Sequence, residues 1–174
     1  MPHATSLRAA ALALGLALTG LGLPVAAEPL PAPEGPVVLT VRGAISSTNG
    51  DDAAAFDMEM LRAVGERSFE TSTIWTDGTH SFTGVSLDAL LAAVGAEGTT
   101  IKATALNDYA VEIPVSDAIP DGPIIAYEMD GAQMSRRDKG PLWVIYPFDS
   151  TDSYRSETVY SRSIWQLDRI EILD

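Results

Sequence analysis

Basic and hydroxyl side chains gather near the end of the sequence. Arg155 lies in a long polar segment, residues 149–157, and Ser161, Arg162 and Ser163 follow it closely. Loops of this kind often carry binding residues on a rigid scaffold. Guanidinium and hydroxyl groups donate hydrogen bonds, so together they suit an oxo, hydroxyl or phosphate group of a ligand. The alternative is that the arginines are solvated surface residues.

Aromatic, acidic and amide side chains stand beside two predicted turns. Trp75 precedes the turn residues Asp77 and Gly78, and Asn107 and Tyr109 flank the second turn. A tryptophan ring can cover the face of a flat ligand, whereas a carboxylate, an amide and a phenol offer polar atoms at its edge. Each residue also has an ordinary structural role, Trp75 in the core and Asp77 and Asn107 as turn formers.

Thiolate chemistry is excluded because the chain contains no cysteine. Disulfides, Cys-ligated zinc, iron–sulfur clusters and a cysteine nucleophile therefore cannot occur. His80 is the one histidine after residue 27, which excludes a multi-histidine metal site in that part of the chain. His80 could serve as a general base, but no serine partner can be chosen from the sequence, and a hydrogen-bonded structural role is the simpler interpretation.

The chain is strongly acidic, with a formal charge of −13. Residues 1–27 contain one arginine, Arg8, and no acidic residue, so their removal changes −13 to −14. Such a charge repels nucleic acid and anionic lipid, and we expect neither as a partner. An anionic ligand would need a place where the few arginines and lysines gather.

The first residues are typical of a secretory signal. Arg8 precedes an apolar run, Ala9–Leu23, and small residues end at Ala27, which predicts cleavage there and a periplasmic protein. A retained anchor is the alternative, but about 15 apolar residues are fewer than a bilayer needs. Residues 28–36 are proline-rich and predict an extended linker, and residues 37–174 are long enough for one soluble domain without a membrane-inserted segment.

The pattern of the remaining chain predicts two helices among many short strands. One helix is expected after the turn and capping residues 49–52, with apolar positions from Phe56 to Val64, and a second after Ser86, ending at Gly95. Strands are expected at residues 37–42, 69–75, 99–106, 109–115, 124–129, 143–146 and 167–173. This pattern favours an α+β domain with a mixed or barrel-like sheet.

Several segments, in this order along the chain, resemble the sulfite-oxidase-type molybdopterin-binding domain. They are Phe82-Thr83-Gly84-Val85-Ser86-Leu87-Asp88-Ala89-Leu90-Leu91, Asn107-Asp108-Tyr109-Ala110-Val111-Glu112-Ile113-Pro114, Ala126-Tyr127-Glu128-Met129-Asp130-Gly131, Gly140-Pro141-Leu142-Trp143-Val144-Ile145-Tyr146-Pro147 and Tyr160-Ser161-Arg162-Ser163-Ile164-Trp165. The resemblance spans roughly residues 37–174 and implies the fold of that family, a mixed barrel-like sheet with a few short helices.

The missing cysteine separates this chain from the enzymes of that family, which coordinate molybdenum through a cysteine near the segment that here is Ser72–Trp75. The chain is more similar to a cysteine-less group of small exported proteins of the same fold. That likeness implies a bound pterin, free or molybdopterin-like, without protein-coordinated molybdenum. It also implies a membrane-anchored partner, such as a sensor that controls cyclic-dinucleotide turnover.

The resemblance turns the residues above into candidates for a pterin site. A pterin is a flat ring with a 2-amino-4-oxo edge, so it needs an aromatic cover and polar groups in the ring plane. Arg162 corresponds to a basic family position close to the pterin. The candidate residues are Trp75, Asp77, Asn107, Tyr109, Tyr154, Arg155, Ser161, Arg162 and Ser163.

Three functions are compatible with these observations. The first is a non-catalytic periplasmic module that binds a pterin and reports it to a membrane-bound signalling partner. The second is a molybdopterin-dependent oxidoreductase that lacks a cysteine ligand to the metal. The third is an interaction protein whose pocket is vestigial. The basic turn Arg136–Lys139 could meet a partner or be solvated, and we assign it to the surface.

Overall fold

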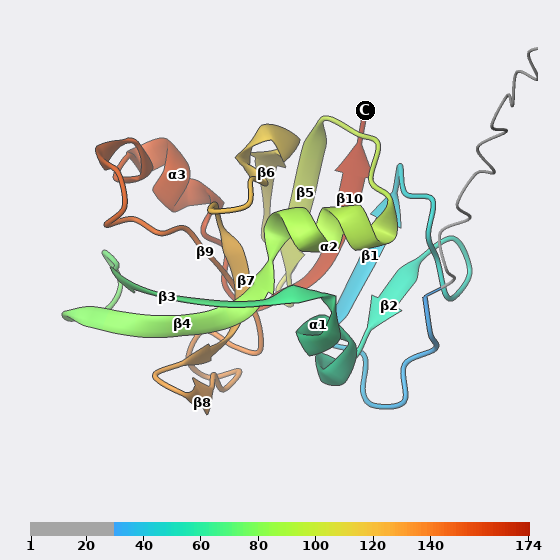
Figure 1. Cartoon of the computed structure of the whole chain (residues 1–174), viewed down its shortest axis with the longest axis horizontal. Helices are drawn as coiled ribbons and strands as arrows, with labels where there is room; N and C mark the ends of the chain where they lie inside the picture. The colour runs from blue at the N-terminus through green and yellow to red at the C-terminus, as the bar shows by residue number, and fades with distance from the viewer. Residues whose placement is uncertain (1–29) are drawn as a thin grey trace, which may run out of the picture.

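Two five-stranded sheets form the framework of the computed structural model, which describes residues 30–174 (Figure 1). The expected signal, residues 1–27, lies outside the described residues. The elements are β1 Leu39–Gly43, β2 Ala54–Phe56, α1 Met58–Gly65, β3 Glu66–Ser72, β4 Thr79–Ser86, α2 Leu87–Val94, β5 Thr100–Ala105, β6 Ala110–Pro114, β7 Ile124–Met129, β8 Ala132–Gln133, β9 Trp143–Ile145, α3 Glu157–Arg162 and β10 Leu167–Leu173, with 3-10 turns at Val115–Asp117 and Asp152–Tyr154.

The first sheet has the strand order β2-β1-β10-β5-β6, so the first and last of the described strands are neighbours in it. Strand β1 runs parallel to β10, with Val41 opposite Ile170, and the other neighbours are antiparallel. The short turn between β5 and β6 places Asn107 and Tyr109 at one end of this sheet, as the sequence predicts.

The second sheet has the order β3-β4-β7-β8, and β9 pairs with β7. Strands β3 and β4 form a long hairpin that extends to one side of the domain in Figure 1. Its strands pair from Glu66 opposite Val85 to Ser72 opposite Thr79, so the connecting loop spans residues 73–78. The predicted turn at Asp77 and Gly78 is present, and Gly78 adopts a φ of 78° that suits glycine.

A shared apolar core holds the sheets together. Val41 and Ile101 of the first sheet and Val85 and Ile125 of the second belong to one buried cluster. Helix α2 adds its four apolar side chains to it and ends at Gly95, which has left-handed geometry, as predicted. Ser86 occupies the helix N-cap position, but its hydroxyl bonds to Asp88 instead of to the backbone. The α+β class is therefore confirmed, and the strands form two sheets rather than a closed barrel.

The first helix begins later than the sequence pattern predicts. Phe56 ends strand β2, and Asp57 is the residue that caps α1, by accepting a hydrogen bond from the Met60 N–H at 2.9 Å. Residues 49–52 instead lead into β2, where Asn49 bonds to the backbone of Ala55. The predicted helix start was wrong because Phe56 pairs with Leu39 of β1 and so belongs to the sheet. The local sequence pattern does not reveal this pairing.

Residues 30–36, within the proline-rich segment expected to be a linker, have no helix or strand and make several contacts with the rest of the domain. The backbone N–H groups of Glu34 and Gly35 each donate to Asp57 at 2.8 Å, and Asn49 donates to the Pro31 carbonyl at 2.7 Å. Leu30 packs against the core. Within residues 30–174 no helix has the length and apolar character needed to cross a membrane.

Candidate functional site

A pocket of about 460 Å³ lies between the β3–β4 loop, the β5–β6 turn and helix α3 with the segment that follows it. It brings together five of the predicted site residues from three distant parts of the chain. The lining residues are Trp75, Ala105, Asn107, Tyr109, Glu157, Tyr160, Ser161, Ser163, Ile164, Trp165 and Gln166.

Aromatic rings form one wall of this pocket. The Trp75 ring centroid lies 5.8 Å from that of Trp165 and 5.9 Å from that of Tyr160, and both contacts are edge-to-face. Tyr109 and Trp165 are 58% and 38% exposed, so they contribute apolar surface at the mouth of the pocket. Such a wall can cover a flat ring, because edge and face contacts between aromatic groups are favourable.

The loop that carries Trp75 is fixed at several points. Strand β3 ends at Ser72, three residues before Trp75, so Trp75 lies in the loop and not at the strand end that the sequence predicts. The Trp75 N–H donates to Thr73 Oγ1 at 3.1 Å. Asp149 accepts hydrogen bonds from the Ser72 N–H at 2.6 Å and from the Ser72 hydroxyl at 2.7 Å. These bonds hold the tryptophan in place before any ligand enters.

The polar atoms of the lining come mainly from amides and hydroxyls. Asn107 accepts a hydrogen bond from the Tyr109 N–H at 3.2 Å, which leaves its amide N–H groups for a ligand. Ser161 donates to Thr158 O at 2.7 Å, and the buried Ser163 donates to Val159 O at 3.3 Å. Both serine hydroxyls are therefore committed as donors to helix carbonyls and can act toward a ligand as acceptors.

Residues 58–151, more than half of the chain, match the protein family described as the oxidoreductase molybdopterin binding domain. The chain belongs to this family. The matched range includes Trp75, Asn107 and Tyr109, whereas the pocket residues of α3 and beyond follow it. The resemblance inferred from the sequence is thereby confirmed.

One solved structure with the same fold is the sulfane dehydrogenase SoxCD from Paracoccus pantotrophus. It superimposes with a TM-score of 0.59 at 16% sequence identity, over 78% of this chain and 38% of the SoxCD chain. This molybdopterin binding domain therefore spans well under half of the length of the chain that it matches. None of the curated proteins matches the sequence.

Arg162, a predicted site residue, does not line the pocket of this molybdopterin binding domain. Its guanidinium donates to Asp117 Oδ2 at 2.8 Å, and the Tyr146 hydroxyl donates to the same oxygen at 2.7 Å. Both charged side chains are only about one-fifth exposed. Burial and the neighbouring Asp117 raise the pKa of Tyr146, so it stays protonated and donates. The group is a structural link between α3 and the turn after β6.

Arg155 and Tyr154 also do not line the pocket. Arg155 donates to the Phe148 carbonyl at 3.2 Å and pairs with Asp149. The hydrogen bonds from Ser72, together with Arg155, lower the pKa of Asp149 to about 2. Tyr154 packs against Tyr146, with ring centroids 5.5 Å apart. Arg155 therefore does not contact the pocket directly. It pairs with Asp149, whose carboxylate also accepts the hydrogen bonds from Ser72 at the end of β3.

Asp77 contributes its backbone rather than its carboxylate to hydrogen bonding. Its carbonyl lies 3.0 Å from His80 Nε2, and its side chain is not part of the pocket. His80 Nδ1 lies 2.6 Å from Asp130, which raises the pKa of His80 and lowers that of Asp130. His80 thus has the structural role that was the simpler interpretation of the sequence.

Four further polar or aromatic residues line the pocket although the sequence did not predict them, namely Glu157, Tyr160, Trp165 and Gln166. Trp165 and Tyr160 belong to a segment that resembles the family, and this resemblance was the one sequence feature that could have indicated them as pocket residues. Nothing in the sequence places Gln166 there, because its location depends on backbone bonds to the basic turn. The Gln166 N–H donates to Lys139 O at 3.0 Å, and Lys139 Nζ lies 5.0 Å from the Trp165 ring centroid.

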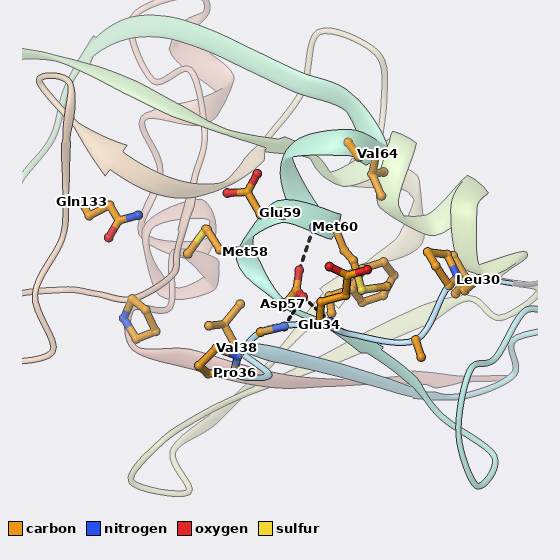
Figure 2. A pocket seen from close by; sticks show the side chains of 16 residues that line it. Leu30, Glu34, Pro36, Val38, Asp57, Met58, Glu59, Met60, Val64 and Gln133 are labelled. Atoms are coloured by element: carbon orange, nitrogen blue, oxygen red, sulfur yellow. Dashed lines mark hydrogen bonds between the residues drawn. The ribbon is translucent and has the colours of Figure 1, made fainter.

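A larger pocket of about 830 Å³ lies between residues 30–38 and helix α1, away from these residues (Figure 2). Figure 2 shows Asp57 at its centre, bonded to the backbone of Met60. The carboxylate also accepts the two N–H groups of residues 34 and 35, and these backbone bonds lower its pKa. Asp57 is thus committed to fastening the N-terminal segment, and none of the predicted site residues is present.

The family's cofactor can be compared with the residues available here. The pterin part requires an aromatic cover and polar edges, which the pocket has. The metal part requires a protein ligand, and the loop Thr73–Gly78 that follows β3 offers hydroxyls, a carboxylate and an indole but no thiolate. Within residues 30–174 no three His, Cys, Asp or Glu side chains are grouped as a metal site. The residues therefore fit a pterin and do not fit the thiolate-bound metal.

Proposed function

We propose that this molybdopterin-binding-family domain is a non-catalytic, periplasmic module that binds a pterin and reports its presence to a membrane-bound partner. The observation that carries the proposal is the pocket beside Trp75. Its volume of about 460 Å³ lies within the usual range for small-molecule sites. No step of a redox reaction is assigned to any of its residues.

The pocket offers the two kinds of contact that a pterin needs. Trp75, Tyr160 and Trp165 form an aromatic surface for the ring, and Asn107 and Gln166 place amides among them. Amides can both donate and accept, which suits the mixed donor and acceptor edge of a pterin. The hydrogen bonds that hold the Trp75 loop reduce the entropy lost on binding.

The absence of cysteine favours binding over catalysis. Without a thiolate, a molybdenum atom would be held by the pterin alone, and the protein would lose its main means of fixing the coordination and tuning the potential. We therefore propose that the pterin is bound without molybdenum coordinated by the protein.

Exposed apolar residues at the mouth of the pocket support a reporting role. Tyr109 and Trp165 line the pocket, and the exposed Ile74 and Leu106 are adjacent in sequence to the lining residues Trp75 and Ala105. A partner that contacts this rim would sense whether the pocket is filled. The predicted export signal favours a partner anchored in the membrane, such as one that controls cyclic-dinucleotide turnover.

The second candidate is a molybdopterin-dependent oxidoreductase without a cysteine ligand. Membership of a family described by oxidoreductase activity favours it. Metal analysis of the protein purified from its native host separates the two functions. Stoichiometric molybdenum supports the oxidoreductase, and its absence from pterin-loaded protein supports the binding module.

Thermal unfolding tests the proposed pterin binding. The purified protein is heated alone and with reduced and oxidised pterins, with flavins and nucleotides as controls. A bound ligand stabilises the folded state, so we expect a concentration-dependent rise in Tm for pterins only. If no pterin raises the Tm, the proposed function is wrong.

A further inference from the structure

Glu157 is the one charged residue among the described residues that line the aromatic pocket. It is the first residue of α3 and is exposed to solvent. Within residues 30–174 its carboxylate makes no hydrogen bond or ion pair. Two other carboxylates in contact with residues of α3 or the segment before it are paired, Asp117 with Arg162 and Asp149 with Arg155. Glu157 therefore has both oxygens available for a ligand.

The cations near the pocket do not reach its lining. The two arginines of these ion pairs are absent from it, and Lys139 stacks on Trp165 without lining the pocket. The pocket thus combines one free carboxylate with amides and aromatic rings. This combination favours ligands that present N–H donors and disfavours anionic ones.

We infer that Glu157 determines the ligand specificity of this site by accepting hydrogen bonds from two adjacent N–H groups on the edge of the ring. This inference rests on the proposed function. A pterin presents its 2-amino group and the neighbouring ring N–H side by side, and the two oxygens of a carboxylate can accept both. Glu157 takes the role that the sequence suggested for Asp77, whose side chain lies outside the pocket.

The ligand class follows from this contact. It is a flat, uncharged heteroaromatic ring with an amino group next to a ring N–H and without a phosphate. If an oxo group replaces the amino group, an acceptor oxygen of the ring faces an acceptor oxygen of the carboxylate, and the two repel each other.

The test compares pterin with lumazine, which carries an oxo group in place of the 2-amino group. Affinities of both are measured by titration calorimetry for the unmodified protein and for Glu157→Gln. Glu97→Gln is the matched control, since Glu97 is also exposed and lies outside the pocket. We expect the unmodified protein and the control to bind pterin about tenfold or more tightly than lumazine, because hydrogen bonds to a charged group are strong.

In Glu157→Gln the preference for pterin over lumazine should fall to about threefold or less. The glutamine amide has one oxygen and one NH2 group, so it can donate to the lumazine oxo group but cannot offer an acceptor to each of two adjacent N–H groups. An unchanged preference in this variant overturns the role of Glu157 and leaves pterin binding intact. If the unmodified protein binds neither compound, the proposed function itself fails. A thermal unfolding curve for Glu157→Gln checks that the variant is folded.

Discussion

Trp75 and Trp165 meet edge to face, with ring centroids 5.8 Å apart and ring planes at 75°. Trp75 lies in the loop of the β3–β4 hairpin, and Trp165 lies between α3 and β10. Their contact closes one side of the pocket by joining the second sheet to the end of the chain. Trp143 lies 5.8 Å from Trp75 and 6.4 Å from Trp165, so a buried ring supports both.

Replacement of Trp75 should abolish most pterin binding. We expect Trp75→Ala to weaken pterin affinity by about tenfold or more, because each aromatic pair contributes about 0.5–1.5 kcal/mol beyond the area that it buries. Trp75→Phe should retain more of the affinity. Ile74→Ala is the control, since Ile74 is 61% exposed and does not line the pocket. Equal affinities in calorimetry for Trp75→Ala and this control would contradict the assignment of the site.

Arg162 should matter for stability and not for ligand affinity. We expect Arg162→Ala to lower the free energy of unfolding by about 1–3 kcal/mol, because Asp117 loses a charged donor in a mostly buried place. Urea unfolding measures this loss. In a double-mutant cycle with Asp117→Asn, the combined loss should be smaller than the sum. Unchanged stability combined with lost pterin binding would restore Arg162 as a ligand contact.

His80 should make stability depend on pH. Its two ring nitrogens face the Asp130 carboxylate and the Asp77 carbonyl, and both bonds are donated only by the protonated ring. The pKa of His80 is raised, so its contribution is complete below the unfolded value of about 6.5 and is lost as pH rises through the folded-state pKa.

His80→Gln tests this dependence. The stability difference between the unmodified protein and the variant should shrink between about pH 5.5 and about pH 8.5 in urea unfolding. A difference that stays constant, or grows with pH, would show that His80 protonation does not support the hairpin loop.

Gly84 should tolerate no side chain. A Cβ at this position would lie 2.2 Å from the Ile125 carbonyl oxygen and 2.6 Å from Ala126 Cα, both backbone atoms of the neighbouring strand. We expect Gly84→Ala to lower the free energy of unfolding by at least about 2 kcal/mol, because β4 and β7 must separate. Gly50→Ala, whose Cβ would meet its nearest atom at 4.0 Å, should change stability by less than about 0.5 kcal/mol. Similar losses in the two variants would argue against a backbone clash.

Local patterns predicted the elements that lie deep in the fold. Strands β7 and β10 have the bounds expected from their apolar residues, and α2 ends at Gly95 as its pattern requires. Prediction was less successful at edges. Phe56 fits a helical pattern, but pairing with β1 makes it part of a strand. Edge positions depend on neighbours that are distant in sequence, and the local pattern contains no information about them.

The sequence predicted only some of the residues that line the candidate site, because the local pattern does not show which distant residues meet. Trp75, Asn107, Tyr109, Ser161 and Ser163 line the pocket, since turns and the segment before the last strand are places where side chains become available. Arg155 and Arg162 do not line this pocket, because each guanidinium pairs with a nearby carboxylate. For Arg162 that partner is Asp117, 45 residues earlier in the chain.

The sequence by itself determined the class of fold, the family, the absence of thiolate chemistry and the high negative charge. The fold class, the absence of thiolate chemistry and the charge depend on residue types and short-range periodicity, and the family on the resemblance of whole segments, all of which a linear sequence contains in full. Only the tertiary structure decided which polar groups face the pocket, that Arg155 and Arg162 are held in ion pairs, and that Glu157 is free. Each of these outcomes depends on distances of a few ångströms between residues far apart in the chain, and packing of the whole domain sets those distances.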